Sequence, residues 1–376
     1  MTINDVIVFL VACFFLLGAV DKAVFQGKFG LGPAVEAGVA QIGGLIFFLV
    51  GVMCLVPLIV QILTPVLTPL YGLFGGDPGA FAGIIIGPDA GGYAMASAMS
   101  DNEQVIALSG IFLSSMLGLT LIFALPWGMS VVQKEDRELL LKGMLCGIIA
   151  SPIGAIIAGL CAGFNLGFMI INLIPAIVIV ILVVIGILFA QNVVIKILSV
   201  YSRIIIALAA IAVGFACFEM LTGIKLIPWI DSIDDKLSIM GSIGISMGGA
   251  LALVFLLQKL LKKPFIALGK AMKINDTAVL GIVASIANAM PVLSDMFKDM
   301  DKRGKLMCAA FTAPAWCALG SHLAFTSTVM PQYLVPMIIG KLAGGIIAML
   351  LAILFFGKQV GVGESVVAPA AAVEEN

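Results

Sequence analysis

Two apolar segments of this chain are each interrupted near the middle, and they constrain its fold more than any other feature. In residues 77–102 an apolar arm is followed by GPDAGG and then YAMASAMS, and in residues 275–301 an apolar arm is followed by NAMP and then VLSDMF. The two segments lie near corresponding points of the two halves of the chain. Paired interruptions are typical of secondary transporters, in which broken helices bring free backbone groups to the middle of the membrane.

Composition assigns the chain to the membrane proteins. Hydrophobic residues make up 62% of it and charged residues 11%, and the mean hydropathy is +1.21. A soluble protein of this length needs a charged surface, which this sequence lacks. The net charge of −1 argues against nucleic-acid binding. The seven cysteines stand singly in apolar runs without disulfide or metal spacing, so we expect no metal site and no cofactor.

Apolar runs of about 20 residues, the length that crosses a bilayer, predict spanning helices besides the two broken segments. Nine such runs begin near residues 5, 41, 104, 138, 165, 201, 238, 305 and 332. Residues 358–376 are small, polar and acidic, which predicts a disordered tail. The sequence therefore predicts an all-α polytopic membrane protein.

The basic residues distinguish between two topologies of the broken segments. If both segments cross the membrane, the 19 lysines and arginines outside the spans divide 10 to 9. If both are re-entrant hairpins, they divide 17 to 2, with Lys225 and Lys236 on the less basic side. The positive-inside rule favours hairpins, and arms of about ten residues reach only about 15 Å, half of the hydrocarbon core. We therefore expect an external N-terminus and a cytoplasmic C-terminus.

Hairpins of this kind give the two halves of the chain opposite orientations, as in an inverted-repeat transporter. The first repeat, with one hairpin, is expected at 1–161, and the second, with the other hairpin, at 201–357. A connecting transmembrane helix with an interfacial segment is expected at 162–200 and the tail at 358–376. Weak internal similarity supports the repeat, since LGLTLIF at 117–123 is similar to LGSHLAF at 319–325.

Short motifs spread along nearly the whole chain carry a resemblance to a known family. They are AVDK (19–22), GKFGLG (27–32), DPGAFAG (77–83), PDAGGY (88–93), NAMP (288–291), MDKRGK (300–305), LGSHLAF (319–325) and PMIIGKLAGG (336–345). In combination they resemble the bacterial ethanolamine-utilisation permease family (EutH). The resemblance implies an integral inner-membrane protein that moves ethanolamine across the bilayer. Asp295 departs from the pattern, because an uncharged residue is expected there.

Protonated ethanolamine is a small cation with one hydroxyl group, so its site needs acceptor oxygens, a hydroxyl partner and an aromatic face for a cation–π contact. Asp89, at the tip of the first hairpin, is the leading candidate, because a carboxylate at the membrane centre costs roughly 2.5–3.5 kcal/mol. Its alternative role is to cap the helix that follows. Asn288, at the opposite tip, either binds the substrate or satisfies backbone groups freed by Pro291.

Two further candidates, Tyr93 and Ser97, lie on the second arm of the first hairpin. Two more are His322, the only histidine of the chain, and Trp316, six residues before it. Tyr93 and Ser97 are four residues apart and share a helix face, where they either contact the substrate or form a polar stripe between helices. His322 interrupts an apolar span. It either binds the substrate or a proton, or it forms a hydrogen bond between helices. Trp316 lines the same cavity or packs in the core.

Together with these residues, the family resemblance implies an inner-membrane permease that moves ethanolamine, or a close small amine, into the cytoplasm, with the membrane potential as driving force. A monovalent cation gains about 2.3 kcal/mol per 100 mV, which is roughly fifty-fold accumulation without a coupling ion. The alternative is a proton- or sodium-coupled carrier of another small polar metabolite. An intramembrane enzyme is disfavoured, because the sequence lacks HExxH, a GxGD pair and GxSG with a separate histidine.

Overall fold

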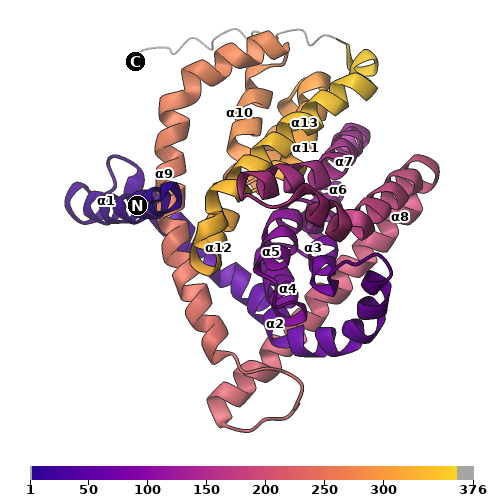
Figure 1. The fold of residues 1–376 in the computed structure, drawn as a ribbon. Helices are drawn as coiled ribbons and strands as arrows, with labels where there is room; N and C mark the ends of the chain where they lie inside the picture. Colours follow the sequence, from indigo (N-terminus) through magenta and orange to yellow (C-terminus); the bar gives the residue numbers. More distant parts are fainter. Residues whose placement is uncertain (1, 362–376) are drawn as a thin grey trace.

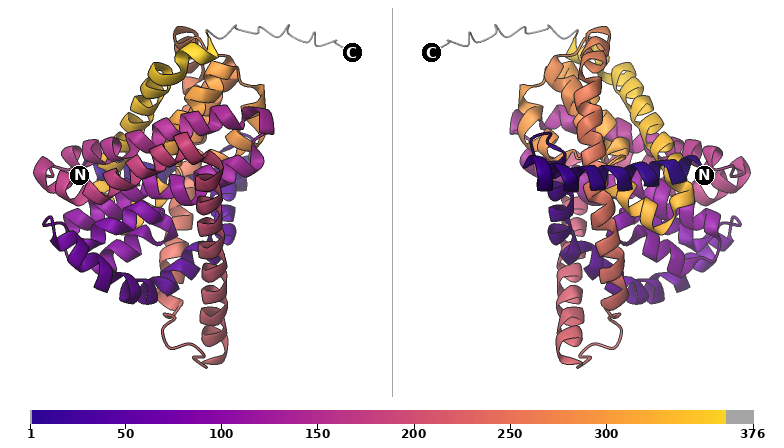
Figure 2. Two further views of the ribbon diagram at one scale, coloured as in Figure 1. Left: turned by 90° about the vertical axis from the view of Figure 1, so that its right-hand side faces the viewer. Right: turned by 90° about the vertical axis from the view of Figure 1, so that its left-hand side faces the viewer.

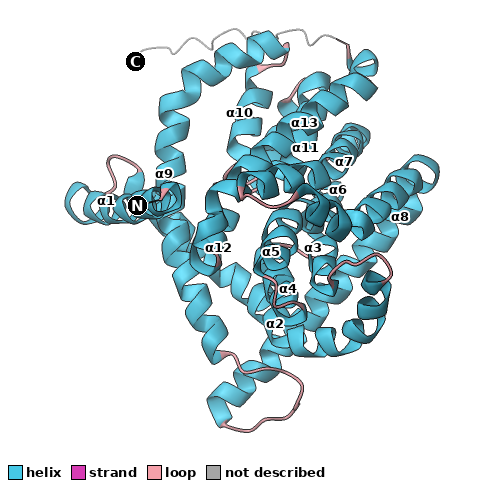
Figure 3. Cartoon of the chain, in the orientation of Figure 1, coloured by secondary structure: helices cyan, strands magenta, loops and turns pink. Residues whose placement is uncertain are grey.

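The computed structural model describes residues 2–361, apart from the side chains of residues 44, 45, 258, 261–268 and 270, and its regular elements are helices joined by short loops (Figures 1 and 3). Seven helices in this range are long and apolar enough to cross a membrane. These two observations confirm the all-α polytopic class. Most of the tail predicted at 358–376 lies outside the described residues.

The longest helices frame the molecule. They are α1 (Ile3–Phe25), α2 (Leu31–Gly72), α7 (Arg137–Cys161), α8 (Leu166–Thr222), α9 (Asp234–Met272) and α13 (Leu334–Val360). α1 lies across α9, and α2 packs against both α8 and α9 (Figure 2). In an apolar stretch of 18 residues, only 11% of the residues of α1 and 22% of those of α8 are buried. Both helices therefore present an apolar face to the surroundings, as contact with lipid requires.

α8 consists of two antiparallel helices. Ala190 has non-helical backbone angles (φ −143°, ψ 45°), and a Cβ built on Gly186 would lie 2.6 Å from Val194 Cγ2. Since eight residues of a straight helix cover about 12 Å, the chain reverses between these two positions. The reversal produces the two separate helices that the sequence predicts from residues 165 and 201.

Residues 77–102 form a closed hairpin, which we call hairpin 1. One arm is Pro78–Phe81 (η1) with α3 (Ala82–Ile85), and the other is Pro88–Gly92 (η2) with α4 (Tyr93–Met99). The Asp77 carboxylate accepts hydrogen bonds from Gly79 N (2.8 Å) and from Ser100 Oγ (2.8 Å). The two ends of the segment therefore meet, as a re-entrant hairpin requires.

The tip of hairpin 1 is broken because its backbone leaves the helical region. Ile86 is extended (φ −153°, ψ 151°), and Gly91 has φ +112°, a value that favours glycine. The break frees backbone groups, which need hydrogen-bond partners where water is excluded. One partner comes from α8, where the Tyr201 hydroxyl donates to Ile85 O at 2.8 Å.

Residues 275–301 form a second closed hairpin, hairpin 2. Its arms are α10 (Asp276–Ser285) and Val292–Met296 (η6) followed by Phe297–Asp299 (η7). Asn275 N donates to Asp301 Oδ1 (2.9 Å) and Asn275 Nδ2 to Asp299 O (3.0 Å), so the ends of this segment meet as well. In Figure 1, α10 follows the upper end of α9, whereas α3 and α4 lie in the lower half of the view.

The continuous span predicted from residue 305 is wrong, because the structure divides this segment. α11 (Lys302–Ala315) and α12 (Ser321–Val329) are separated by the non-helical residues 316–320. This break lies along hairpin 2, where Cys317 N donates to Ser285 O (3.2 Å) and Leu319 N to Ile286 O (2.9 Å). The two interrupted helices thus satisfy each other's free backbone groups, which stabilises both breaks.

The segment 103–131 runs through the centre of the molecule. It contains α5 (Glu103–Val105), η3 (Ile106–Gly118), η4 (Thr120–Ala124) and α6 (Leu125–Val131). Nearly every residue of the π-helical η3 is buried, and hairpin 1, α7, α11 and α13 pack against it. At Gly118 a Cβ would lie 2.2 Å from Ile86 O, so the backbone of η3 touches the tip of hairpin 1.

The order of elements is similar in the two halves. Hairpin 1, the segment 103–131 and α7 come in the same order as hairpin 2, α11 with α12, and α13. The inversion that would relate the two sets, and the boundaries predicted at 161 and 201, stay predictions.

Candidate substrate site

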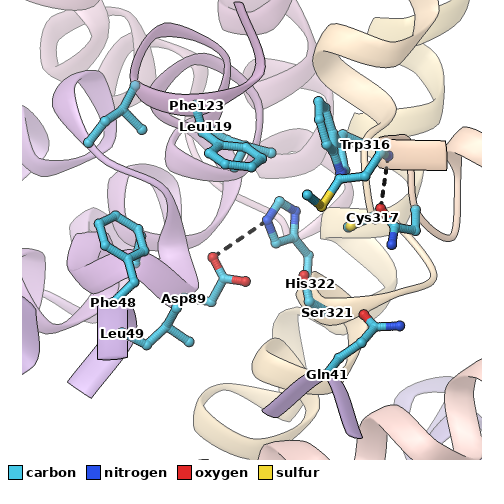
Figure 4. A pocket seen from close by; sticks show the side chains of 14 residues that line it. Gln41, Phe48, Leu49, Asp89, Leu119, Phe123, Trp316, Cys317, Ser321 and His322 are labelled. Atoms are coloured by element: carbon cyan, nitrogen blue, oxygen red, sulfur yellow. Dashed lines mark hydrogen bonds and ion pairs between the residues drawn. The ribbon is translucent and has the colours of Figure 1, made fainter. Parts of the chain in front are cut away.

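A cavity lies where the tips of the two hairpins, the 316–320 break, α2 and η4 come together (Figure 4). Its volume is about 130 Å³, whereas a single water molecule needs about 10–15 Å³. Its lining is mainly apolar and aromatic with a few polar groups, and consists of Gln41, Phe48, Leu49, Asp89, Ala90, Leu119, Ile122, Phe123, Asn288, Met290, Trp316, Cys317, Ser321 and His322. An apolar cavity with few polar groups is the usual form of a small-molecule site.

Asp89 and His322 face each other across this cavity (Figure 4). Asp89 Oδ1 lies 3.8 Å from His322 Nε2, which is too long for a direct hydrogen bond. Both side chains are buried, with exposed fractions of 8% and 1%. His322 Nδ1 has no hydrogen-bond partner within residues 2–361. The pair therefore retains hydrogen-bonding capacity for a small polar molecule.

Three neutral polar side chains complete the polar part of the lining. Ser321 precedes His322 at the start of α12, Gln41 belongs to α2, and Asn288 lies at the tip of hairpin 2. Asn288 Oδ1 accepts a hydrogen bond from Met290 N at 3.0 Å. The same amide thus bonds the turn before Pro291 and lines the cavity, so the structure is consistent with both roles predicted for it.

Aromatic rings cover one side of the cavity. Trp316 packs edge to face on Phe123, with ring centroids 5.6 Å apart, and Phe48 lies beside Asp89 (Figure 4). Trp316 is 3% exposed, so it packs in the core and also lines the cavity. Aromatic faces next to a buried carboxylate suit a cation, because the ring quadrupole attracts positive charge.

Tyr93 and Ser97 are not part of this lining. Tyr93 packs edge to face against Phe325 of α12, with ring centroids 5.9 Å apart. Ser97 Oγ is buried without a hydrogen-bond partner in the described part of the chain. The position of Tyr93 favours the alternative interpretation, in which α4 uses it for a contact between helices.

Sequence analysis does not single out Gln41, Cys317 or Ser321 as parts of the site. A glutamine or serine inside an apolar run is a weak signal, because either side chain also satisfies backbone groups of its own helix. The one usable signal is the pair Pro314 and Gly320, which brackets the break that brings Cys317 and Ser321 to the cavity.

Comparison with known proteins decides the family. The family model described as "Ethanolamine utilisation protein, EutH" matches residues 3–355. This chain belongs to the EutH family. The resemblance drawn from the motifs is thereby confirmed.

Known relatives are similar to this chain over almost their full length. A protein named "Probable ethanolamine permease EutH" from Listeria monocytogenes is 37% identical over 348 residues, which is 93% of each chain. The protein of the same name from Escherichia coli is 33% identical over 396 residues, 96% of this chain and 97% of the relative. The uncharacterized protein YxeR of Bacillus subtilis is 35% identical over 348 residues, 93% of this chain and 94% of the relative. No solved structure matches this chain.

Proposed function

We propose that this EutH protein is an ethanolamine permease of the bacterial inner membrane, and not an enzyme. One observation carries the proposal: Asp89 and His322 face each other, 3.8 Å apart, in a mostly apolar cavity formed by broken helices. Two relatives from the same family, in Listeria and Escherichia, are named probable ethanolamine permeases.

In the proposed complex, protonated ethanolamine occupies the space between these two side chains. The ammonium group lies beside the Asp89 carboxylate and against the rings of Phe48 or Phe123, where an ion pair and cation–π attraction both favour a cation. The hydroxyl group bonds His322 or Ser321, since a neutral imidazole and a serine each donate and accept. The site thus recognises both ends of the molecule.

The proposed direction is inward, with the membrane potential as driving force. A monovalent cation gains about 2.3 kcal/mol per 100 mV, which allows roughly fifty-fold accumulation. The alternative, coupling to protons or sodium, requires a second gradient.

The test is uptake of labelled ethanolamine into proteoliposomes that contain the purified protein. We expect uptake that is accelerated by an inside-negative potential, set with potassium and valinomycin, at equal pH and without sodium. Uptake that requires a pH or sodium gradient would favour the coupled carrier. Absence of protein-dependent uptake under all of these conditions would refute the proposed function.

The proposed topology has an external N-terminus, a cytoplasmic C-terminus and hairpins that enter from opposite faces. Asp101 follows hairpin 1 and Lys302 follows hairpin 2, and both are exposed. Single cysteines at these two positions, in a variant without native cysteines, should react with an impermeant thiol reagent from opposite sides of the membrane. Labelling from the same side would show that the hairpins do not enter from opposite faces.

A further inference from the structure

Lys341 is a second charged group in the centre of the protein, and the proposed binding mode does not use it. It lies in α13, close to three glycines of the same helix, and it is 0% exposed. Its Nζ donates a hydrogen bond to Ser115 O of the π-helical η3. A buried cation needs more than one neutral acceptor, because a charge in a low-dielectric interior is costly unless an opposite charge balances it.

The buried carboxylates within residues 2–361 are those of Asp21 and Asp89. Asp89 is the one close to this region, because the tip of hairpin 1 packs against η3, the same segment that accepts the hydrogen bond from Lys341. Other buried charges within residues 2–361 have their own partners. Lys305 pairs with Asp136 at 2.7 Å, and the Asp21 carboxylate accepts hydrogen bonds from Phe29 N, in the loop before α2, and from Gly32 N, in the first turn of α2.

Packing places Asp89 and Lys341 in one structural unit. Lys341 is bonded to Ser115, and Gly118, three residues further along η3, touches Ile86 at the tip of hairpin 1. Asp89 belongs to that tip. Both charged groups are therefore held against the same central segment, η3. We expect a movement that carries the cavity across the membrane field to carry both of them.

We propose that Lys341 is the fixed counter-charge of Asp89, so that the empty site is neutral and the site loaded with a monovalent cation carries one net positive charge. The inference rests on the proposed function. It assigns the voltage-dependent step: the loaded carrier moves charge, and the empty carrier returns without moving any. Without the lysine charge the assignment reverses, because the empty site is negative and the loaded site is neutral.

Tracer exchange distinguishes these cases. With saturating ethanolamine on both sides of a proteoliposome, the carrier cycles only through its loaded forms. If those forms carry one charge, 100 mV shifts their distribution roughly fifty-fold, which slows exchange about fourfold for a barrier midway across the field. We expect this slowing in the unmodified protein and in Lys341→Arg, and exchange that is independent of potential in Lys341→Met.

Two outcomes would overturn the inference. One is exchange by the unmodified protein that does not respond to potential although net uptake does, and this test needs no variant. The other is equal slowing in the unmodified protein and in Lys341→Met. Failure of the proposed function is distinct from both, because the unmodified protein would then show no net uptake that responds to potential.

Discussion

Replacing Asp89 by asparagine is expected to raise the KM for ethanolamine uptake by roughly 30-fold or more. Removal of one member of a buried charge pair costs about 2–5 kcal/mol, and each 1.4 kcal/mol is a factor of ten. The substitution also leaves Lys341 without its counter-charge, which adds repulsion against a bound cation. Asp89→Asn should still insert into the membrane, because a neutral amide costs less there than a carboxylate.

The matched control for this variant is Asp295→Asn. Asp295 lies on the second arm of hairpin 2, is exposed, and accepts a hydrogen bond from Ser294 Oγ at 2.9 Å. It is not part of the cavity lining, so uptake by this variant should match that of the unmodified protein. An unchanged KM in Asp89→Asn would show that the Asp89 carboxylate does not bind the ammonium group.

Replacing Gly118 by alanine is expected to lower ethanolamine uptake by about tenfold or more. The added Cβ would lie 2.2 Å from Ile86 O and 2.7 Å from Ile86 C, both of which are backbone atoms. The tip of hairpin 1 must therefore move, and Asp89 moves with it. Displacements of about 1 Å in a site of this kind can reduce function by as much as about a hundredfold.

Gly214→Ala in α8 is the control, because a Cβ there has no atom within 4 Å among its described neighbours. Alanine is the better helix former by about 1 kcal/mol, so this variant should retain full uptake and melt at an equal or higher temperature in detergent. If Gly118→Ala transports as well as Gly214→Ala, the contact between η3 and hairpin 1 does not position the site.

The sequence predicts both hairpins because the residues that break each helix lie at the break itself. GPDAGG combines proline with glycines, and NAMP combines a polar amide with proline. The break at 316–320 is missed because AWCALG resembles part of an apolar span, although Pro314 and Gly320 bracket it. It is stabilised by hydrogen bonds from Cys317 and Leu319 to hairpin 2, and these partners are far away in the sequence.

Part of the cavity lining can also be predicted from the sequence. Four residues stand out in the sequence as polar or aromatic side chains within apolar segments, and all of them line the cavity: Asp89, Asn288, Trp316 and His322. Their proximity depends on the unpredicted break, which sets α12 beside hairpin 1. The sequence places Lys341 inside a span without showing its partner, because Ser115 is 226 residues away.

Protection of Cys317 by ethanolamine would show directly that this cavity is the substrate site. Cys317 lines the cavity and is 9% exposed, so with the other six cysteines replaced it reports on the cavity through slow reaction with a small neutral methanethiosulfonate. We predict that ethanolamine slows this reaction at concentrations near its KM for uptake. Ethylene glycol, which has no ammonium group, should not, and Asp89→Asn should abolish the protection. If saturating ethanolamine leaves the labelling rate unchanged in protein that transports ethanolamine, the cavity is not the substrate site.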